Sequence, residues 1–196
     1  MDFTLPPEAE AYRARVADFV ARRILPLEAD PANFADHGNL PLPVLETVRA
    51  EVRAEGLWAP QVPRALGGLG LPFVAQAAAY EEMNRSVFGP VCFNAAAPDD
   101  GNMRLLAQIG TEAQQAGWLA PVVSGAARSA FAMTEPAPGA GSDPAMMRTR
   151  AERHGAGWRV TGRKWYITGA GAADRFILVA RTSEDARRGL SAFLFE

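Results

Sequence analysis

The spacing of apolar residues changes once along this 196-residue chain, and that change limits what the chain can fold into. Up to about residue 125, apolar residues recur at the period of a helix with one buried face. After Phe131, apolar and polar residues alternate, as they do in half-buried strands. We therefore predict a multidomain α+β protein. An all-α helical bundle over residues 1–125 is followed by an incomplete antiparallel β domain over residues 126–196.

Helix start and stop signals divide the first part into segments. Thr4 is placed to cap the first helix, with Pro6 and Pro7 in its first turn. Thr111 and Gln114 have the spacing of a capping box for the last helix. Short connections between the segments favour antiparallel neighbours. We expect helices near residues 4–27, 43–55, 73–87, 98–109 and 111–124.

Apolar stripes indicate which helix faces are buried. The first helix carries a stripe from Tyr12 to Leu27 at helical spacing, and we expect it to pack in the core. In the third helix we expect an inward face of Phe73, Val74, Ala77, Ala78 and Tyr80, and we expect Glu81, Glu82 and Arg85 to face solvent. These features predict packing and no chemistry.

The second part contains short predicted strands. They lie near residues 147–152, 158–165, 176–180 and 191–195, with a turn at 154–157. The last strand is followed at once by Glu196, which would leave a sheet edge uncovered. We therefore expect the chain to be an N-terminal portion of a longer protein.

Composition excludes several classes of function. The net charge of −2, with nearly balanced cationic and anionic residues, argues against a nucleic-acid or polybasic membrane partner. One cysteine, Cys92, and two histidines, His37 and His154, cannot form a disulfide or a zinc ligand set. We expect Cys92 in the core, both histidines in turns and no metal site. The start of the chain lacks a secretory signal and no apolar run is long enough to span a bilayer, so we expect a cytoplasmic protein.

The residues from Phe131 to Asp143 form the first segment that indicates chemistry. Hydroxyls and carboxylates flank a run of Pro and very small residues, so the backbone can approach a ligand closely and offer its N–H groups. Such a loop suits a flat, polar, phosphate-bearing cofactor, although the same composition is common in plain surface loops.

Lys164 to Gly169 form a second segment of this kind. An aromatic pair, Trp165 and Tyr166, stands beside the hydroxyl of Thr168 and could stack on the same ligand. The glycines that follow resemble the start of a dinucleotide fingerprint, but a strand and not a helix is expected next. We therefore reject a Rossmann site and interpret the two segments as a pair.

Together these segments resemble the acyl-CoA dehydrogenase family of flavoproteins. The resemblance rests first on Met133-Thr134-Glu135-Pro136 followed by Gly141-Ser142-Asp143. It rests also on the run from Gly162 to Gly169, and it extends over essentially the whole chain. Members of the family are about twice as long, with the rest of the β domain and a C-terminal helical domain still to follow.

The resemblance implies bound FAD and an acyl-CoA substrate. Phe131, Met133 and Thr134 would line the flavin ring, and Ser142 would lie between the flavin pyrophosphate and the pantetheine arm of the substrate. Ile167 would also contact the cofactor. In the second segment, Tyr166 would pack against the ring and Thr168 would offer its hydroxyl to flavin N5.

The implied reaction is dehydrogenation at the α and β carbons of the thioester, as in fatty acid metabolism. The family takes its proton-abstracting Glu from the C-terminal domain, so no catalytic residue is assigned here and the isolated chain is expected to be inactive. A full-length homo-oligomer that passes electrons to an electron-transfer flavoprotein is implied. Two alternatives stay open: a related flavin oxidase or monooxygenase, and a non-catalytic scaffold subunit that pairs with a catalytic partner.

Two departures from the family pattern stand out. The segment between Pro136 and Gly141 looks longer than in many members, which weakens the assignment of Ser142. Tyr166 occupies a position that is Trp in many members. Stacking survives that exchange, with a smaller ring and an added hydroxyl.

Overall fold

The computed structural model describes residues 4–35, 40–139, 141–185 and 188–196, and the chain divides into two compact units. The first comprises Met1–Ala96 with Ala107–Ile109, and the second comprises Ala97–Leu106 with Gly110–Glu196. The predicted domain boundary at residue 125 stays a prediction, since compact units and changes of secondary structure need not coincide.

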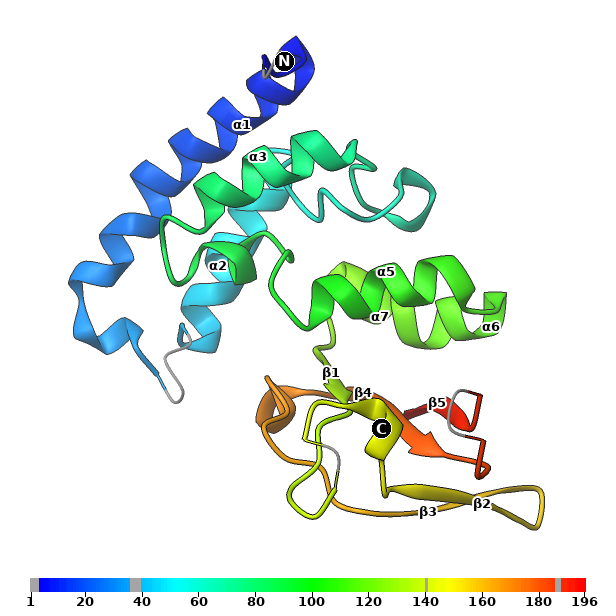
Figure 1. Cartoon of the computed structure of the whole chain (residues 1–196). Helices are drawn as coiled ribbons and strands as arrows, with labels where there is room; N and C mark the ends of the chain where they lie inside the picture. The colour runs from blue at the N-terminus through cyan, green and yellow to red at the C-terminus, as the bar shows by residue number, and fades with distance from the viewer. Residues whose placement is uncertain (1–3, 36–39, 140, 186–187) are drawn as a thin grey trace. The chain divides into compact units, whose positions relative to one another are not determined.

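The first unit is helical (Figure 1). It contains α1 (Pro7–Phe19), α2 (Leu42–Ala54), α3 (Phe73–Met83) and the short α4 (Gly89–Cys92). The first helix continues as a π-helical turn, Val20–Ile24, and a 3-10 turn, Leu25–Ala29. Single 3-10 turns lie at Pro31–Asn33 and Arg64–Leu66.

The apolar stripe of α1 forms the core of this unit, as predicted. Tyr12, Val16 and Phe19 are buried and Leu27 is half-buried, and α1 packs along α3. The cap position predicted for Thr4 is wrong, because Pro6 is the N-cap residue of α1.

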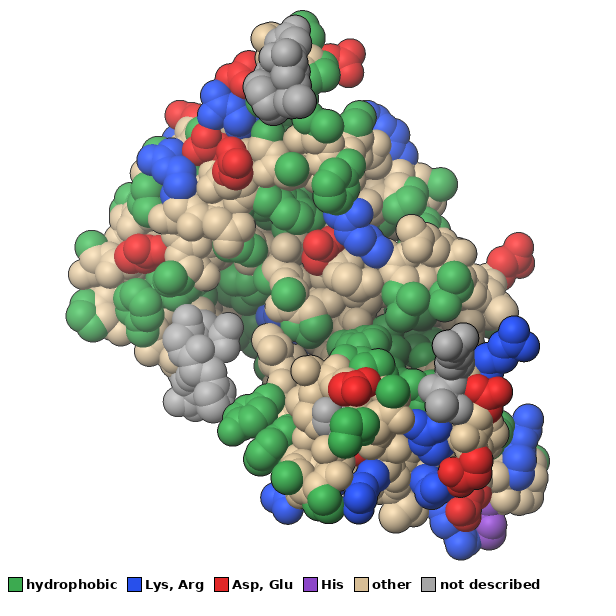
Figure 2. Space-filling view, viewed as in Figure 1, with side chains coloured by type: hydrophobic (Ala, Val, Ile, Leu, Met, Phe, Trp, Pro, Cys, Tyr) green, Lys and Arg blue, Asp and Glu red, His purple; other side chains and the backbone are tan. Residues whose placement is uncertain are grey.

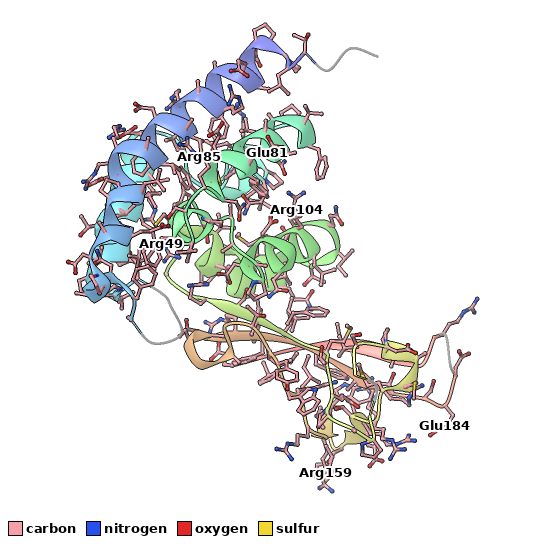
Figure 3. The ribbon with its side chains drawn as sticks, turned by 60° about the vertical axis from the view of Figure 1, so that its left-hand side comes forward. Arg49, Glu81, Arg85, Arg104, Arg159 and Glu184 are labelled. Atoms are coloured by element: carbon pink, nitrogen blue, oxygen red, sulfur yellow. The ribbon has the colours of Figure 1, made fainter. Side chains whose placement is uncertain are left out.

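The inward face predicted for α3 is wrong in part. Phe73 is 73% exposed, and Val74 and Ala77 are also exposed, whereas Ala78 is buried as predicted. The other buried positions are Ala75, Gln76, Ala79 and Met83. Alanine side chains on this face let α3 lie close to α1. Glu81 faces solvent, as predicted (Figure 3).

The second unit begins with helices. Its helical part contains α5 (Asp99–Ile109), α6 (Glu112–Gln114), a π-helical turn (Gln115–Leu119) and α7 (Ala120–Ser124). The capping box predicted for Thr111 and Gln114 is present, with both reciprocal hydrogen bonds.

In the described residues of the second unit, five strands follow the helices. They are β1 (Ser129–Ala132), β2 (Arg150–His154), β3 (Gly157–Thr161), β4 (Arg175–Arg181) and β5 (Leu190–Phe195). The predicted order of helices followed by an incomplete sheet is confirmed. The sheet is mixed and not purely antiparallel, since β4 pairs antiparallel with β5 but parallel with β1 and with the start of β2. Both parallel pairings are long-range, so the alternation of apolar residues did not reveal them.

The alternation before β2 is confirmed. Met147, Thr149 and Ala151 are buried, and Arg148 and Arg150 are exposed. The hairpin partner β3 pairs antiparallel with β2 from Arg150↔Thr161 to His154↔Gly157. Trp165 does not belong to a strand, contrary to the prediction; it lies in the segment 162–168 between β3 and the 3-10 turn Ala170–Ala172.

Other expectations concern membranes and metals. None of the described helices is both long enough and apolar enough to cross a membrane. The described residues also contain no group of three His, Cys, Asp or Glu side chains arranged to hold a metal. The predicted turn at residues 36–39, which includes His37, lies outside the described residues.

Candidate functional site

The two segments that the sequence pairs lie side by side in the second unit. The backbone N–H of Trp165 donates to the carbonyl oxygen of Thr134 at 3.1 Å. Next to it, Lys164 Nζ donates to the carbonyl oxygen of Met133 at 2.8 Å. The chain that leaves β1 is thereby joined to the segment that follows β3, so Met133 and Thr134 contact the two residues that precede Tyr166.

Glu135 occupies the centre of this junction. Its carboxylate, 2% exposed, accepts hydrogen bonds from Lys164 Nζ at 2.9 Å and from the backbone N–H groups of Arg148 at 2.7 Å and Thr149 at 2.8 Å. Burial by itself would raise the pKa of this carboxyl, but the Thr149 side chain, the two N–H groups and Lys164 outweigh burial and hold the pKa at about 2. Burial lowers the pKa of Lys164, an effect that Glu135 opposes. Glu135 is therefore an ionised structural group and is unsuited to act as a base.

The loop after Glu135 is a closed turn. The Glu135 N–H donates to the Gly141 carbonyl at 3.1 Å, and the Gly139 N–H donates to the Pro136 carbonyl at 2.8 Å. A Cβ on Gly139 would lie 2.7 Å from Glu135 Oε2, so this position requires glycine. Beyond the turn, Ser142 is exposed and the Asp143 carboxylate accepts the Ala145 N–H at 2.8 Å, which starts a 3-10 turn, Pro144–Met146.

Tyr166 is presented to solvent in an unusual backbone conformation. Its φ is +51°, a left-handed value that a bulky residue rarely adopts, and the residue is 81% exposed. Its ring lies 4.6 Å from that of Trp165, centroid to centroid, at a tilt of 39°. Thr168 is also exposed, and Ile167 is half-buried. An exposed, conformationally restricted aromatic ring beside hydroxyl groups fits a flat ligand with polar edges.

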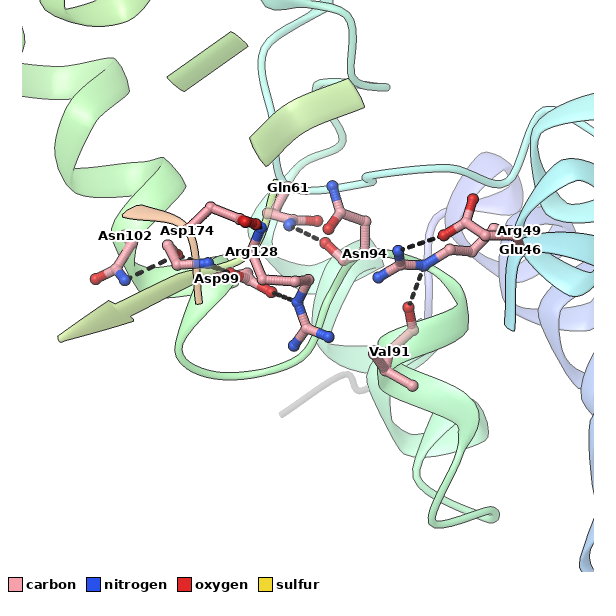
Figure 4. Close-up of polar contacts among 10 residues, drawn as sticks. Glu46, Arg49, Gln61, Val91, Asn94, Asp99, Asn102, Arg128 and Asp174 are labelled. Atoms are coloured by element: carbon pink, nitrogen blue, oxygen red, sulfur yellow. Dashed lines mark hydrogen bonds and ion pairs between the residues drawn. The ribbon is translucent and has the colours of Figure 1, made fainter. Parts of the chain in front are cut away.

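The start of β1, which leads to Phe131, Met133 and Thr134, is held by a buried polar cluster (Figure 4). Asp99 accepts hydrogen bonds from Arg128 Nε at 2.5 Å and from the Ser129 N–H and hydroxyl at 2.7 Å each. Asn102 Nδ2 donates to the same hydroxyl at 2.9 Å, and Asp174 accepts the Arg128 N–H at 3.0 Å.

The three residues predicted to line the flavin ring, Phe131 in β1 and Met133 and Thr134 just after it, are all half-buried. Sequence reasoning missed the polar cluster beneath them, because its members lie far apart in the chain and no motif connects them.

Arg181 at the end of β4 was also missed. The guanidinium donates to the carbonyls of Met147 at 3.1 Å and Ala145 at 2.8 Å, and it reaches the carbonyls of Ser183 and Asp185 at 3.4 and 3.3 Å. It therefore ties the residues after Asp143 to the loop before β5.

The features that the sequence analysis set aside as non-functional have ordinary surroundings. Cys92 is fully buried, and burial raises its pKa to about 12, so it is a core residue as predicted. His154 is the last residue of β2 and not a turn residue, contrary to the prediction. Its ring lies 3.0 Å from the guanidinium of Arg159, which is at the exposed end of the hairpin (Figure 3). Lys and Arg side chains mix with Asp and Glu around this hairpin (Figure 2). The glycine-rich run forms a three-residue 3-10 turn followed by β4, which excludes a dinucleotide-binding helix there.

A helical part followed by a mixed sheet, with these two joined segments, defines a flavoprotein dehydrogenase fold. The family model "Acyl-CoA dehydrogenase, N-terminal domain" matches residues 6–126, and "Acyl-CoA dehydrogenase, middle domain" matches residues 130–196. This chain belongs to the acyl-CoA dehydrogenase family.

Similar proteins agree with this assignment. "Probable acyl-CoA dehydrogenase FadE2" of Mycobacterium tuberculosis is 37% identical over 195 residues, which are 95% of this chain and 46% of the relative. A Mycobacterium abscessus structure assigned to the acyl-CoA dehydrogenases aligns with TM-score 0.86 and 33% identity, over 98% of this chain and 51% of that one. A glutaryl-CoA dehydrogenase from Mycobacterium smegmatis in complex with FADH2 aligns with TM-score 0.72 and 26% identity, over 97% and 46%. The chain spans about half the length of these relatives.

Proposed function

We propose that this chain contributes FAD-contacting residues to an enzyme that dehydrogenates an acyl-CoA thioester at its α and β carbons. The observation that carries the proposal is the junction of the two segments, in which Lys164 and Trp165 bond to the carbonyls of Met133 and Thr134. This junction joins the residues immediately before an exposed ring, Tyr166, and the hydroxyl of Thr168 to the segment that contains Thr134.

The residues present fit such a cofactor. In the proposed complex, Phe131, Met133, Thr134 and Ile167 contact the flavin ring, and Tyr166 stacks on it. The hydroxyls of Thr134 and Thr168 serve as hydrogen-bond donors to its polar atoms. When bound, FAD would supply the capacity to accept a hydride from the substrate.

Ser142 contributes at the other end of the proposed site. Its exposed hydroxyl, next to the turn closed by Glu135 and Gly141, would lie where the flavin pyrophosphate and the substrate's pantetheine arm meet. This role follows from the family resemblance alone.

Proton abstraction requires a base that these segments do not provide. Of the two carboxylates in the first segment, Glu135 has a pKa of about 2 and three hydrogen-bond partners, which keep it from accepting the substrate proton. Asp143 caps the 3-10 turn that follows it. We propose that the base is a Glu of the C-terminal domain that the family resemblance implies. Electron transfer to an electron-transfer flavoprotein, a homo-oligomeric assembly and a cytoplasmic location belong to the same proposal.

Titration of FAD with the 196-residue chain tests the proposal. We expect quenching of flavin fluorescence and a shifted visible spectrum, and weaker binding by Thr134→Val and Thr168→Val. Thr47→Val, which removes an exposed hydroxyl on α2, is the matched control and should bind as the parent does. Unchanged flavin spectra with a chain that is folded by circular dichroism would refute FAD binding by these residues.

A further inference from the structure

The ion pair between Glu135 and Lys164 has a position that suggests more than stability. We propose that these two are positioning residues, whose buried pair holds Tyr166 and Thr168 beside Thr134 before any cofactor binds. The inference rests on the proposed function, because it concerns how the FAD-contacting segments are held. Neither residue is assigned a contact with the cofactor.

Lys164 is the link on the side of the second segment. Its side chain is 9% exposed, and Nζ bridges the Met133 carbonyl and the Glu135 carboxylate. The next residue, Trp165, bonds through its N–H to the Thr134 carbonyl. Lys164 and Trp165, the two residues immediately before Tyr166, therefore form hydrogen bonds to three consecutive residues of the first segment.

Glu135 connects these hydrogen bonds to the sheet. It accepts the N–H groups of Arg148 and Thr149 while it binds Lys164, and Arg150 begins β2 one residue later. Gly162, two residues before Lys164, also lies against this part of the chain, because a Cβ on Gly162 would overlap Thr149 Oγ1. The second segment is thus fixed to a buried part of the unit.

Tyr166 needs such an external constraint. A left-handed φ at a large residue persists only where its surroundings over-determine it, and 81% exposure of Tyr166 shows that its own side-chain packing is slight. Segment 162–168 lies between β3 and the 3-10 turn, outside both. The contacts of Lys164 and Trp165 therefore supply the constraint.

A purely structural ion pair is the competing explanation, and the two explanations predict different results. A buried pair often adds little net stability over an apolar replacement. If the pair serves positioning, its loss releases the second segment and leaves the strands of the unit protected. If it serves only stability, its loss lowers protection everywhere to a similar extent.

Lys164→Met in the ligand-free chain tests this by amide hydrogen exchange. We expect exchange at the Trp165 N–H to accelerate about tenfold, with no change across β4, as a local opening requires. The near-UV circular dichroism of the adjacent Trp165 and Tyr166 rings should weaken as well. Unchanged exchange at Trp165, or equal acceleration in β4, would overturn the proposal.

The matched control is Glu184→Gln, which breaks the exposed ion pair between Arg150 and Glu184. It should leave exchange at Trp165 unchanged. Lys164→Arg keeps a cation and should restore part of the protection at Trp165, and it serves as the second variant if Lys164→Met fails to fold. Absence of any rescue by Arg would contradict the assigned role of the charge.

FAD binding provides the second readout. The apparent affinity for FAD falls with the fraction of chains in which the two segments are joined, so Lys164→Met should bind FAD more weakly than the parent and Glu184→Gln should not. If the parent chain binds no FAD, the proposed function fails while the exchange result still decides whether the pair holds the segment. If Lys164→Met binds FAD as the parent does, the pair does not position the site.

Discussion

Ser129 donates two hydrogen bonds to one oxygen of Asp99, from its backbone N–H and from its hydroxyl, each at 2.7 Å. This contact joins the first turn of α5 to the first residue of β1 inside the second unit. Arg128 completes the cluster through an ion pair with the other carboxylate oxygen.

Asp99→Asn should destabilise the second unit by about 3 kcal/mol, because it leaves buried donors without a charged acceptor. Urea unfolding followed by far-UV circular dichroism measures the loss. Asp100→Asn is the matched control: the neighbouring carboxylate pairs with Arg104 at a more exposed position, and the expected loss is below about 1 kcal/mol. Equal losses for the two variants would contradict the role assigned to the cluster.

Glu135→Gln should cost stability in a pH-dependent way. The pKa of Glu135 is about 2 in the folded chain against about 4.3 for a free Glu, so its ionised form stabilises the fold above pH 5 by about 3 kcal/mol. That contribution is lost as the pH falls from 5 towards 2, and the difference between parent and variant should narrow over the same range. Glu184→Gln, at a side chain that is 80% exposed, should show a much smaller dependence in urea midpoints measured at each pH. A difference that stays constant from pH 5 to 2 would mean that Glu135 is not held ionised.

Tyr166→Ala should leave stability within about 0.5 kcal/mol of the parent, because the side chain is mostly exposed. It should weaken FAD binding about tenfold if the ring stacks on the cofactor. Tyr166→Gly should be more stable than Tyr166→Ala by about 0.5–1 kcal/mol, since φ is +51° at this position. Phe73→Ala, which removes another exposed ring, should not affect FAD binding measured by fluorescence quenching.

Gly89→Ala should destabilise the first unit by more than about 2 kcal/mol, because a Cβ there would overlap the backbone carbonyl of Met83. Gly101→Ala is the variant to compare with Gly89→Ala. A Cβ at Gly101 meets nothing within 4 Å, and Ala is favoured over Gly inside a helix by about 0.5–1 kcal/mol. Thermal unfolding should therefore shift in opposite directions for the two variants.

The parts of the fold that the sequence predicted are those encoded by local periodicity. The apolar stripe from Tyr12 to Leu27 and the alternation of Met147, Thr149 and Ala151 were recognised because each is a pattern within one short stretch of sequence. The burial of Ala75 and Ala79 in α3 was missed because it depends on the close contact with α1, which the sequence of α3 alone does not reveal.

The candidate site was predictable as residues but not as an arrangement. The two segments were identified by composition and by family resemblance. The bond from Trp165 to Thr134 and the ion pair of Lys164 with Glu135 depend on contacts across 31 and 29 residues. The parallel pairing of β1 with β4 is equally non-local, which is why the mixed character of the sheet was not predicted.

The pairing of β1 with β4 also has a consequence for the order of folding. The hairpin of β2 and β3 closes through a tight turn and can form early, whereas Ser129 must find Arg175 across the whole intervening chain. Segment 162–168 can bond to the residues that follow β1 only after β1 and the β2–β3 hairpin have both formed. The residues proposed to contact the cofactor thus assemble late, after the local hairpin, and a chain that has only collapsed does not yet present them.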